Sequence, residues 1–212
     1  MLALELHRKA QNILCLGAHA DDIEIGCGGT LLKWISQRAD LNIYWAVFSA
    51  EESRADEARA SAEGILQKLS HEIAVHSFRT SFLPFEGSKV KDCFEEIKDS
   101  FAPDIIFTHY RDDRHQDHRL LADLTWNTFR NHLVLEYEIP KYDGDLGAPN
   151  LFVTLDEELA RQKVTHLCRF FQSQADRHWF AQETFLALMR LRGMECASHY
   201  AEAFYCRKLL LA

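Results

Sequence analysis

The sequence predicts an α/β fold in which a mostly parallel sheet is flanked by helices. The first observation behind this prediction is that short apolar segments, typical of buried strands, alternate with longer segments of helical periodicity. The second is continuity, because the 212 residues contain only four prolines and nine glycines, with no low-complexity stretch and no internal repeat. Apolar residues make up 47% and charged residues 26%, as in ordinary globular proteins. We therefore expect residues 1–212 to form a single domain.

The predicted elements alternate along the chain. Apolar or β-rich runs, beginning with ILCLGA, predict strands at 13–18, 41–49, 72–78 and 104–110, and a strand-like segment at 203–211. Helical periodicity or helix-forming composition predicts helices at 28–39, 54–69, 89–101, 118–131, 156–172 and 179–192. In the third of these, Val90, Phe94 and Ile97 fall at spacings of four and three, which places them on one face of a helix. No element is predicted for 132–155.

Composition also limits the function classes. The net charge of −8, from 24 basic and 32 acidic residues, leaves no basic surplus for a nucleic-acid backbone. No stretch approaches the ~20 apolar residues that a membrane span requires, and residues 1–11 carry charges where a signal peptide needs its apolar region. The six cysteines form no C-x-x-C pair, which argues against a thiolate zinc site. We expect a cytoplasmic protein with reduced cysteines and a small-molecule substrate.

Two clusters of polar side chains directly follow predicted strands. They offer three residues each, His19, Asp21 and Asp22 after 13–18, and His115, Asp117 and His118 after 104–110. Ligands of open α/β sheets bind beyond the carboxyl ends of the strands, so both clusters arrive at one edge if these strands are parallel neighbours. Imidazole and carboxylate groups together suit zinc or a similar divalent ion. His19 and Asp22 can converge on one ion across a tight turn, while Asp21 points elsewhere, where a general base belongs.

Less specific interpretations exist for the first cluster and for the glycines of GCGGT that follow it. Either aspartate could simply cap the next helix. The glycines could form a phosphate loop, although they do not fit G-x-G-x-x-G followed by an acidic partner. For Gly28 and Gly29 we favour close packing of a helix on the sheet.

Taken together, AHADD at 18–22 and HQDH at 115–118 resemble the zinc-dependent deacetylase family known as LmbE-like or PIG-L-like. The family signature is A-H-P-D-D, followed about a hundred residues later by H-x-D-H. The resemblance covers roughly the first 130 residues, and the tail resembles the family only in HYAEAF at 199–204. It implies a three-layer Rossmann-like fold and metal-dependent hydrolysis of the N-acetyl amide of an amino sugar or its conjugate. The implied cofactor is Zn²⁺ or another divalent ion such as Fe²⁺, and a homo-oligomer is compatible with the family.

The resemblance also implies a role for each matched residue. The positions that match the family's metal ligands are His19, Asp22 and His118. The positions that match its catalytic groups are Asp21 as general base, His115 as the histidine that stabilises the oxyanion, and Asp117 as the carboxylate that orients it.

Two further matches are weaker. Arg54 resembles an arginine that the family uses on substrate hydroxyls or phosphate, and an exposed arginine at the start of a helix is an equally good interpretation. Tyr200 resembles a late residue near the substrate pocket, but we favour a core aromatic there.

The sequence departs from the family pattern at two places. Ala20 replaces the proline of the signature, which loosens the turn but removes no ligand. Thr80 and Ser81 stand where many members carry an acidic residue, which affects substrate recognition more than catalysis. Three rival functions remain at this stage: a non-catalytic metal- and sugar-binding member of the same fold, a hydrolase of another small amide, and a nucleotide-binding protein. The presence of both Asp21 and His115 argues against the first.

Overall fold

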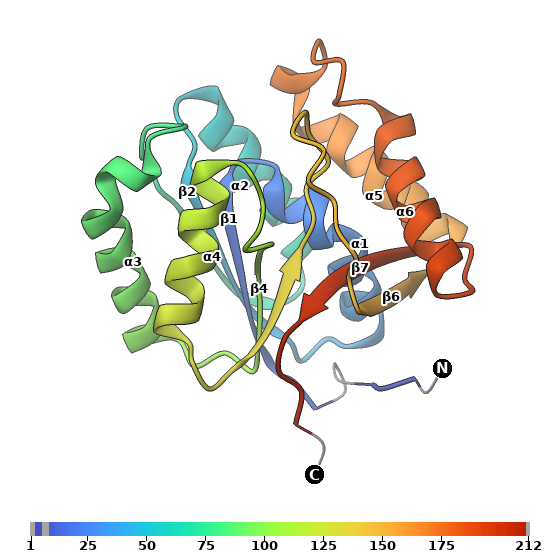
Figure 1. Ribbon diagram of the computed structural model, residues 1–212, viewed down its shortest axis with the longest axis horizontal. Helices are drawn as coiled ribbons and strands as arrows, with labels where there is room; N and C mark the ends of the chain where they lie inside the picture. The colour runs from blue at the N-terminus through green and yellow to red at the C-terminus, as the bar shows by residue number, and fades with distance from the viewer. Residues whose placement is uncertain (1–2, 6–8, 211–212) are drawn as a thin grey trace.

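The computed structural model describes residues 3–5 and 9–210, and its centre is one seven-stranded sheet (Figure 1). The strand order is β3-β2-β1-β4-β5-β7-β6. The strands are β1 Asn12–His19, β2 Asn42–Ser49, β3 Ser70–Val75, β4 Ile105–His109, β5 Leu133–Tyr137, β6 Leu151–Leu155 and β7 Tyr200–Cys206. The α-helices are α1 Asp22–Gln37, α2 Ser53–Leu66, α3 Gly87–Ser100, α4 Gln116–Thr128, α5 Glu157–Phe170 and α6 Gln182–Glu195, with short 3₁₀ turns at Leu83–Glu86 and Gln172–Gln174.

The predicted α/β class is confirmed, since β1 to β5 pair in parallel and only β7 runs antiparallel to its neighbours. Two predictions on individual elements were wrong in their extent. α1 begins at Asp22 and not at 28, although three glycines in its first half weaken helix propensity there. The last strand is Tyr200–Cys206 and not 203–211. Two strands, β5 and β6, lie in the stretch where no element was predicted.

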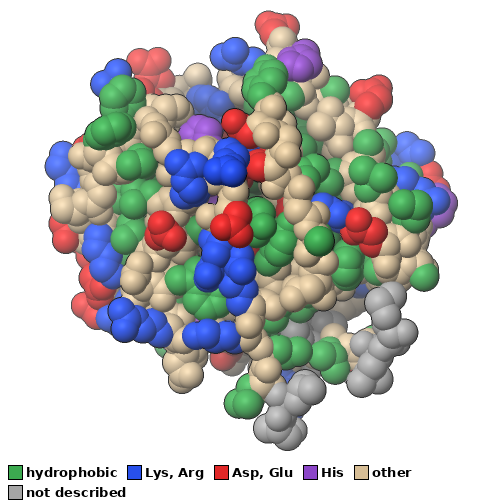
Figure 2. All heavy atoms as spheres, in the orientation of Figure 1, with side chains coloured by type: hydrophobic (Ala, Val, Ile, Leu, Met, Phe, Trp, Pro, Cys, Tyr) green, Lys and Arg blue, Asp and Glu red, His purple; other side chains and the backbone are tan. Residues whose placement is uncertain are grey.

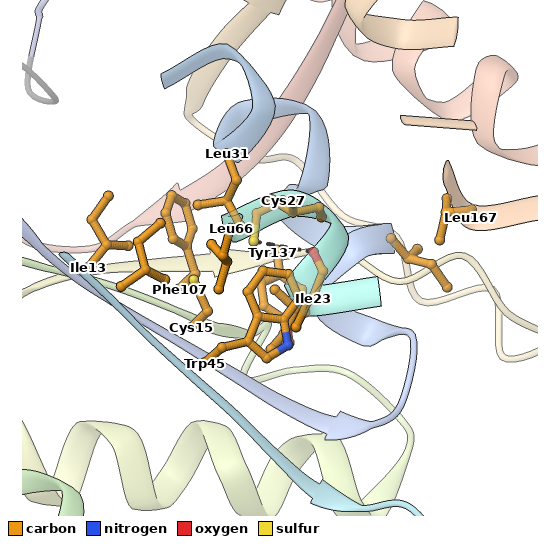
Figure 3. Packing of buried hydrophobic residues seen from close by; sticks show 14 of the residues in the cluster. Ile13, Cys15, Ile23, Cys27, Leu31, Trp45, Leu66, Phe107, Tyr137 and Leu167 are labelled. Carbon is orange, nitrogen blue, oxygen red and sulfur yellow. Dashed lines mark hydrogen bonds between the residues drawn. The ribbon is translucent and has the colours of Figure 1, made fainter. Parts of the chain in front are cut away.

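Alternate residues of the central strands face opposite layers of helices. Ile13 and Cys15 of β1 pack in a cluster with apolar residues of α1, α2, α5 and α6 (Figure 3). Leu14 and Leu16 pack on the other face against α3 and α4. The central strands are therefore apolar on both faces, as expected for strands that are covered from both sides.

This topology places the polar clusters together. β1 and β4 are hydrogen-bonded parallel neighbours, with Cys15 level with Phe107. Both strands end at the same edge of the sheet, at His19 and His109, and the helices that follow them begin there. The polar side chains that follow the two strands therefore lie close together at this edge of the sheet.

None of the helices in the described part of the chain is long and apolar enough to cross a bilayer. On the face shown in Figure 2, lysine and arginine side chains are interspersed with acidic ones and do not merge into one basic surface. This distribution agrees with the negative net charge of the whole chain.

Candidate active site

Three donor atoms from β1, α1 and α4 converge at the edge of the sheet. His19 Nδ1 lies 3.3 Å from Asp22 Oδ2 and 3.1 Å from His118 Nε2, and the last two atoms are 3.5 Å apart. Tetrahedral ligands at the usual 2.0–2.1 Å from zinc are separated by about 3.3 Å. The spacing therefore suits a divalent ion held by His19, Asp22 and His118, the trio that the sequence suggested. A fourth coordination position would stay open to solvent or substrate.

The second nitrogen of each histidine in this trio is bonded to a carboxylate. His118 Nδ1 lies 2.9 Å from Asp113 Oδ2, and His19 Nε2 lies 3.1 Å from Asp117 Oδ2. A carboxylate on the far nitrogen fixes the tautomer of a metal-binding histidine and raises its basicity. The arrangement therefore leaves His118 Nε2 and His19 Nδ1 as the nitrogens for a cation.

The structure places the Asp117 carboxylate differently from the expectation. The resemblance implied that it orients His115, but it contacts His19 and accepts hydrogen bonds from the backbone N–H groups of Ser81 and Leu83, at 2.7 and 3.2 Å. It is the backbone N–H of Asp117 that donates to His115 Nδ1, at 3.2 Å. The reason is that His115 is the N-cap residue of α4, so its ring folds back over the first turn.

Asp21 is buried beside the cation trio but does not belong to it. Its Oδ1 accepts a 2.9 Å hydrogen bond from Arg54 of α2, and its Oδ2 is buried with no hydrogen-bond partner among the described residues. Although Asp21 immediately precedes α1, its carboxylate makes no capping hydrogen bond. A buried carboxylate oxygen without a donor is costly unless another group completes it. The simple capping interpretation is therefore not supported.

His115 lies at the mouth of the site, half-buried. Its ring centroid is 4.7 Å from that of His19 and 4.6 Å from that of His118. Because Nδ1 accepts the N–H of Asp117, Nε2 is the nitrogen left to face a substrate. His19, His115 and His118 also form a group close enough to share one cation.

His109 was not singled out from the sequence, although it is fully buried and its Nε2 is 3.2 Å from Asp22 Oδ2. With Asp22 and His118 it forms another group close enough for a cation. However, His109 Nε2 accepts the backbone N–H of Ala18 at 3.0 Å, and its ring stacks on His118 at 3.9 Å. Because the two rings are stacked, the lone pairs on the nitrogens of His109 and His118 lie in parallel planes and do not converge on one ion. We therefore interpret His109 as a support for Asp22 and His118.

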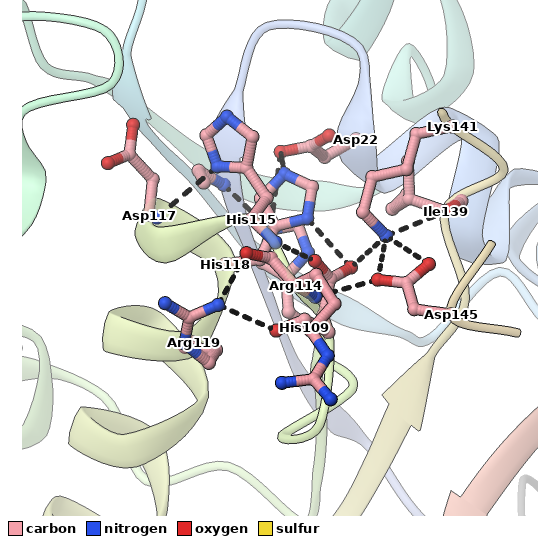
Figure 4. Close-up of polar contacts among 12 residues, drawn as sticks. Asp22, His109, Arg114, His115, Asp117, His118, Arg119, Ile139, Lys141 and Asp145 are labelled. Carbon is pink, nitrogen blue, oxygen red and sulfur yellow. Dashed lines mark hydrogen bonds and ion pairs between the residues drawn. The ribbon is translucent and has the colours of Figure 1, made fainter. Parts of the chain in front are cut away.

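A further support comes from the loop between β5 and β6. The Lys141 ammonium lies 2.8 Å from Asp113 Oδ2 and 2.7 Å from Asp145 Oδ1, and Asp145 accepts the backbone N–H of Arg114 (Figure 4). Lys141 thus ties this loop to the carboxylate behind His118. A motif search could have found Asp113, which lies in the same run of charged residues as His115. Nothing in the sequence near Lys141 indicates its partner.

Burial and charge set the ionisation of these groups. Burial lowers the pKa of His118 to about 3, so the ring is neutral and able to bind a cation. Burial would raise the pKa of Asp22, but the surrounding histidines, His118 first, hold it well below its usual value. Burial also disfavours the charged form of His19, yet Asp22 and Asp117 outweigh it and raise the pKa to about 10. A cation that binds His19 must therefore displace a proton. Burial raises the pKa of Asp21, and Arg54 partly opposes this.

The remaining predicted residues lie outside this centre. A Cβ on Gly29 would come within 2.6 Å of Leu155 Cδ1, which confirms that close packing requires a glycine there. Around Gly28 the nearest atoms are 3.7 and 3.9 Å away, which is ordinary contact. Tyr200 begins β7 and packs against the apolar core.

Comparison with known proteins agrees with this geometry. The family model described as PIG-L: GlcNAc-PI de-N-acetylase matches residues 14–129, more than half of the chain. The chain belongs to the PIG-L family. The match spans β1 to the end of α4, and therefore includes both polar clusters.

Individual relatives extend the likeness to the rest of the fold. The chain is 28% identical over 169 residues to a protein named uncharacterized deacetylase YaiS from Escherichia coli strain K12, an alignment that covers 75% of this chain and 90% of that one. The fold resembles N,N'-diacetylchitobiose deacetylase from Pyrococcus horikoshii with a TM-score of 0.74, 20% identity and coverage of 96% and 86% of the two chains. It also resembles the zinc-inhibited form of teicoplanin deacetylase Orf2, with a TM-score of 0.69, 16% identity and coverage of 92% and 97%.

Proposed function

We propose that this protein is a metal-dependent deacetylase that hydrolyses the N-acetyl amide of an amino sugar or its conjugate to a free amine and acetate. The observation that carries the proposal is the pairing of two features at one sheet edge. Donor atoms of His19, Asp22 and His118 lie 3.1–3.5 Å apart, and an unpartnered carboxylate oxygen of Asp21 is buried beside them. Membership of the PIG-L family and the names of the relatives support the same reaction.

The cation is held by His19, Asp22 and His118 in this proposal, with zinc favoured and iron(II) the other candidate. When bound, such an ion polarises a carbonyl and lowers the pKa of a water molecule from 15.7 to about 7. The related teicoplanin enzyme, whose structure is described as a zinc-inhibited form, supports zinc as an ion that this fold accommodates.

Asp21 acts as the general base. Arg54 holds Oδ1, so Oδ2 is fixed in position to take a proton from the water that attacks the acetyl carbon. The same proton is then delivered to the amine nitrogen as the carbon–nitrogen bond breaks, which leaves acetate. Burial raises the pKa of Asp21, which favours uptake of the proton from the attacking water.

His115 stabilises the oxygen that becomes negative when water adds to the carbonyl. Its Nε2 is free to donate a hydrogen bond, because the N–H of Asp117 fixes the ring through Nδ1. Burial lowers the pKa of His115, as does the charge of His19, which favours a neutral ring. Because Nδ1 accepts the N–H of Asp117, the single proton of that ring is on Nε2, which donates to the developing oxyanion. The Asp117 carboxylate contributes through His19, not through His115 directly.

Arg54 has two roles in the proposal. It orients Asp21, and its side chain is 29% exposed, so the guanidinium also reaches a substrate hydroxyl or phosphate. The substrate is an N-acetylglucosamine-type compound, and a cytoplasmic location agrees with the composition. A homo-oligomer is compatible with the family but carries no part of the mechanism.

A substrate panel with defined metal loading tests the proposal. Metal-free, zinc-loaded and iron(II)-loaded protein are each incubated with N-acetylglucosamine, its glycosides, nucleotide sugars and lipid-linked sugars, and free amine and acetate are quantified. We expect equal amounts of the two products from at least one substrate, and only with metal present. Release from a non-sugar amide alone would favour a hydrolase of another small amide. Tight metal and sugar binding without turnover would favour the non-catalytic alternative.

A further inference from the structure

A buried ion pair that includes no member of the cation trio contacts α1. Lys163 of α5 and Glu202 of β7 are 2.6 Å apart, and their side chains are 4% and 3% exposed. A buried ion pair is a poor source of stability, because desolvation of both charges offsets their attraction. A pair retained at this depth therefore suggests a task other than stabilising the core.

The ion pair is bonded to the backbone of α1. Glu202 accepts the N–H groups of Gly29 at 2.8 Å and Thr30 at 2.6 Å, and Lys163 donates to the carbonyl of Ile25 at 2.6 Å. In a regular α-helix the N–H of Gly29 would donate to the carbonyl of Ile25. Here the pair holds both groups, so side chains from α5 and β7 engage the middle of the helix ladder.

The segment of α1 on the far side of this point carries the site residues. Asp21 and Asp22 lie one turn before Ile25, and Gly26, a residue of low helix propensity, directly follows Ile25. A cavity of about 20 Å³ adjoins Ile25 and Gly26 and is lined by both members of the ion pair. The contacts of the ion pair with α1 therefore begin one turn after the site residues, beside this small cavity.

We propose that Lys163 and Glu202 are positioning residues that clamp the middle of α1 and so fix its first turn, with Asp21 and Asp22, against His19 and His118. Gly29 is part of this device, since a Cβ there would lie 3.0 Å from Glu202 Oε1 and 2.6 Å from Leu155 Cδ1. The inference rests on the proposed function for its catalytic consequence. The effect of the ion pair on the position of α1 does not depend on that function.

The test uses the double variant Lys163→Met/Glu202→Gln, which removes both charges together and leaves no unpaired ion in the core. We expect the zinc dissociation constant of the folded variant to rise about tenfold or more, as for other residues that orient a ligand. On the best substrate kcat should fall by a similar factor, while KM stays within about twofold because no substrate contact is removed. Hydrogen exchange of zinc-free protein should be faster in residues 22–30.

The matched control is the double variant Arg192→Met/Glu138→Gln, which also removes both charges of a buried pair. Arg192 and Glu138 form an ion pair of similar burial, 2.6 Å apart, which lines the same cavity, and within the described residues neither side chain is hydrogen-bonded to α1. Its loss should lower the melting temperature without accelerating exchange in 22–30 and without changing zinc affinity by more than about twofold. If Lys163→Met/Glu202→Gln does not fold, Gly29→Ala displaces the Glu202 carboxylate by crowding and should show the same selective changes.

Two results would overturn the clamp. The first is a folded double variant in which hydrogen exchange of residues 22–30 and zinc affinity equal those of the wild type. The second is a control variant in which both properties change as much as in the double variant, which would mean that both ion pairs only stabilise the fold. The exchange measurement keeps this inference separate from the proposed function. If wild-type protein hydrolyses no amide, the proposed function fails, whereas faster exchange restricted to 22–30 would still support the clamp.

Discussion

The two halves of the sheet contribute to the candidate site in different ways. β1 to β4 and their helices supply the trio of donor atoms, the buried Asp21 and His115, all of them at the ends of parallel strands. β5 to β7, α5 and α6 supply no residue of that trio. They supply Lys141, which contacts Asp113, and the Lys163–Glu202 pair, which contacts α1.

In the proposed mechanism, this difference separates the groups that react from those that hold them in place. A reacting group must end on a rigid element, within about 0.5 Å of its productive position. In this protein part of the support crosses the boundary between the halves, because side chains of the second half bond to α1 and to the loop before α4. Variants in the first half should therefore remove the chemistry, whereas variants at the boundary should weaken it by degrees.

The largest expected effect is loss of a donor from the trio. His118→Ala leaves two protein donors where three were present, so the variant should lose its bound metal and on the order of 10³-fold or more in turnover. The helix should persist, because alanine is a good helix former. Elemental analysis and circular dichroism measure the two properties. One equivalent of metal at wild-type affinity in this variant would show that His118 is not a ligand.

A smaller loss of metal affinity is expected when the carboxylate bonded to His118 is replaced. Asp113→Asn keeps the size of the side chain but removes the charge that pairs with His118 Nδ1 and Lys141. The zinc dissociation constant should rise by about 10- to 100-fold, the usual effect of losing a carboxylate behind a metal-binding histidine. Competition with a chromophoric chelator measures this change. An affinity equal to wild type would mean that the second half of the sheet contributes nothing to the site through Asp113.

Much of this arrangement could be predicted from the sequence, for a physical reason. His19 and Asp22 are close along the chain, and their spacing across a tight turn largely determines their geometry. His115 and His118 likewise share one turn, and the parallel arrangement of β1 and β4 brings the two pairs together. The alternation of strands and helices predicted a parallel sheet, whereas the adjacency of β1 and β4 was a condition that only the structure shows to be met.

The remainder depends on contacts that sequence spacing does not encode. The Asp117 carboxylate accepts from His19 because the loop at Ser81 and Leu83 holds it there, and no local pattern indicates that loop. Lys163 and Glu202 reach α1 from elements far along the chain, and β5 is too short to produce a clear alternation. These parts of the structure follow from packing between distant elements.

The variant Arg54→Ala distinguishes two roles of Arg54 in the first half of the sheet, substrate binding and orientation of Asp21. If Arg54 mainly grips substrate, the variant should raise KM more than it lowers kcat, as when uniform binding is lost. If it mainly orients Asp21, through the 2.9 Å contact, kcat should fall by about tenfold with little change in KM. Steady-state kinetics on the best substrate separates these outcomes. Unchanged values of both constants would return Arg54 to the role of a surface residue.

The smallest effects concern stability where α1 meets the second half. A Cβ on Gly26 would lie 2.2 Å from Tyr137 Cδ2, so Gly26→Ala should lower the free energy of unfolding by about 1–3 kcal/mol. Gly28 is the matched control, because its nearest atoms are 3.7 and 3.9 Å away, and Gly28→Ala should raise stability by about 0.5–1 kcal/mol. Urea denaturation measures both. Equal changes in the free energy of unfolding of the two variants would mean that Gly26 of α1 is not packed closely against Tyr137 of β5.

The different roles proposed for the adjacent residues Asp21 and Asp22 provide the most direct test of the central claim. Asp21 and Asp22 have the same unperturbed acidity, near 3.9, yet only Asp22 lies within the trio while Asp21 Oδ2 has no partner among the described residues. Bound metal and turnover at saturating zinc should be measured for Asp21→Asn and Asp22→Asn. We predict that Asp21→Asn keeps one equivalent of metal and loses on the order of 10²- to 10⁴-fold in kcat, whereas Asp22→Asn binds metal weakly and recovers part of its activity in excess zinc. A metal-free Asp21→Asn beside a metal-replete Asp22→Asn would exchange the two roles, and full activity in metal-loaded Asp21→Asn would contradict the general-base mechanism.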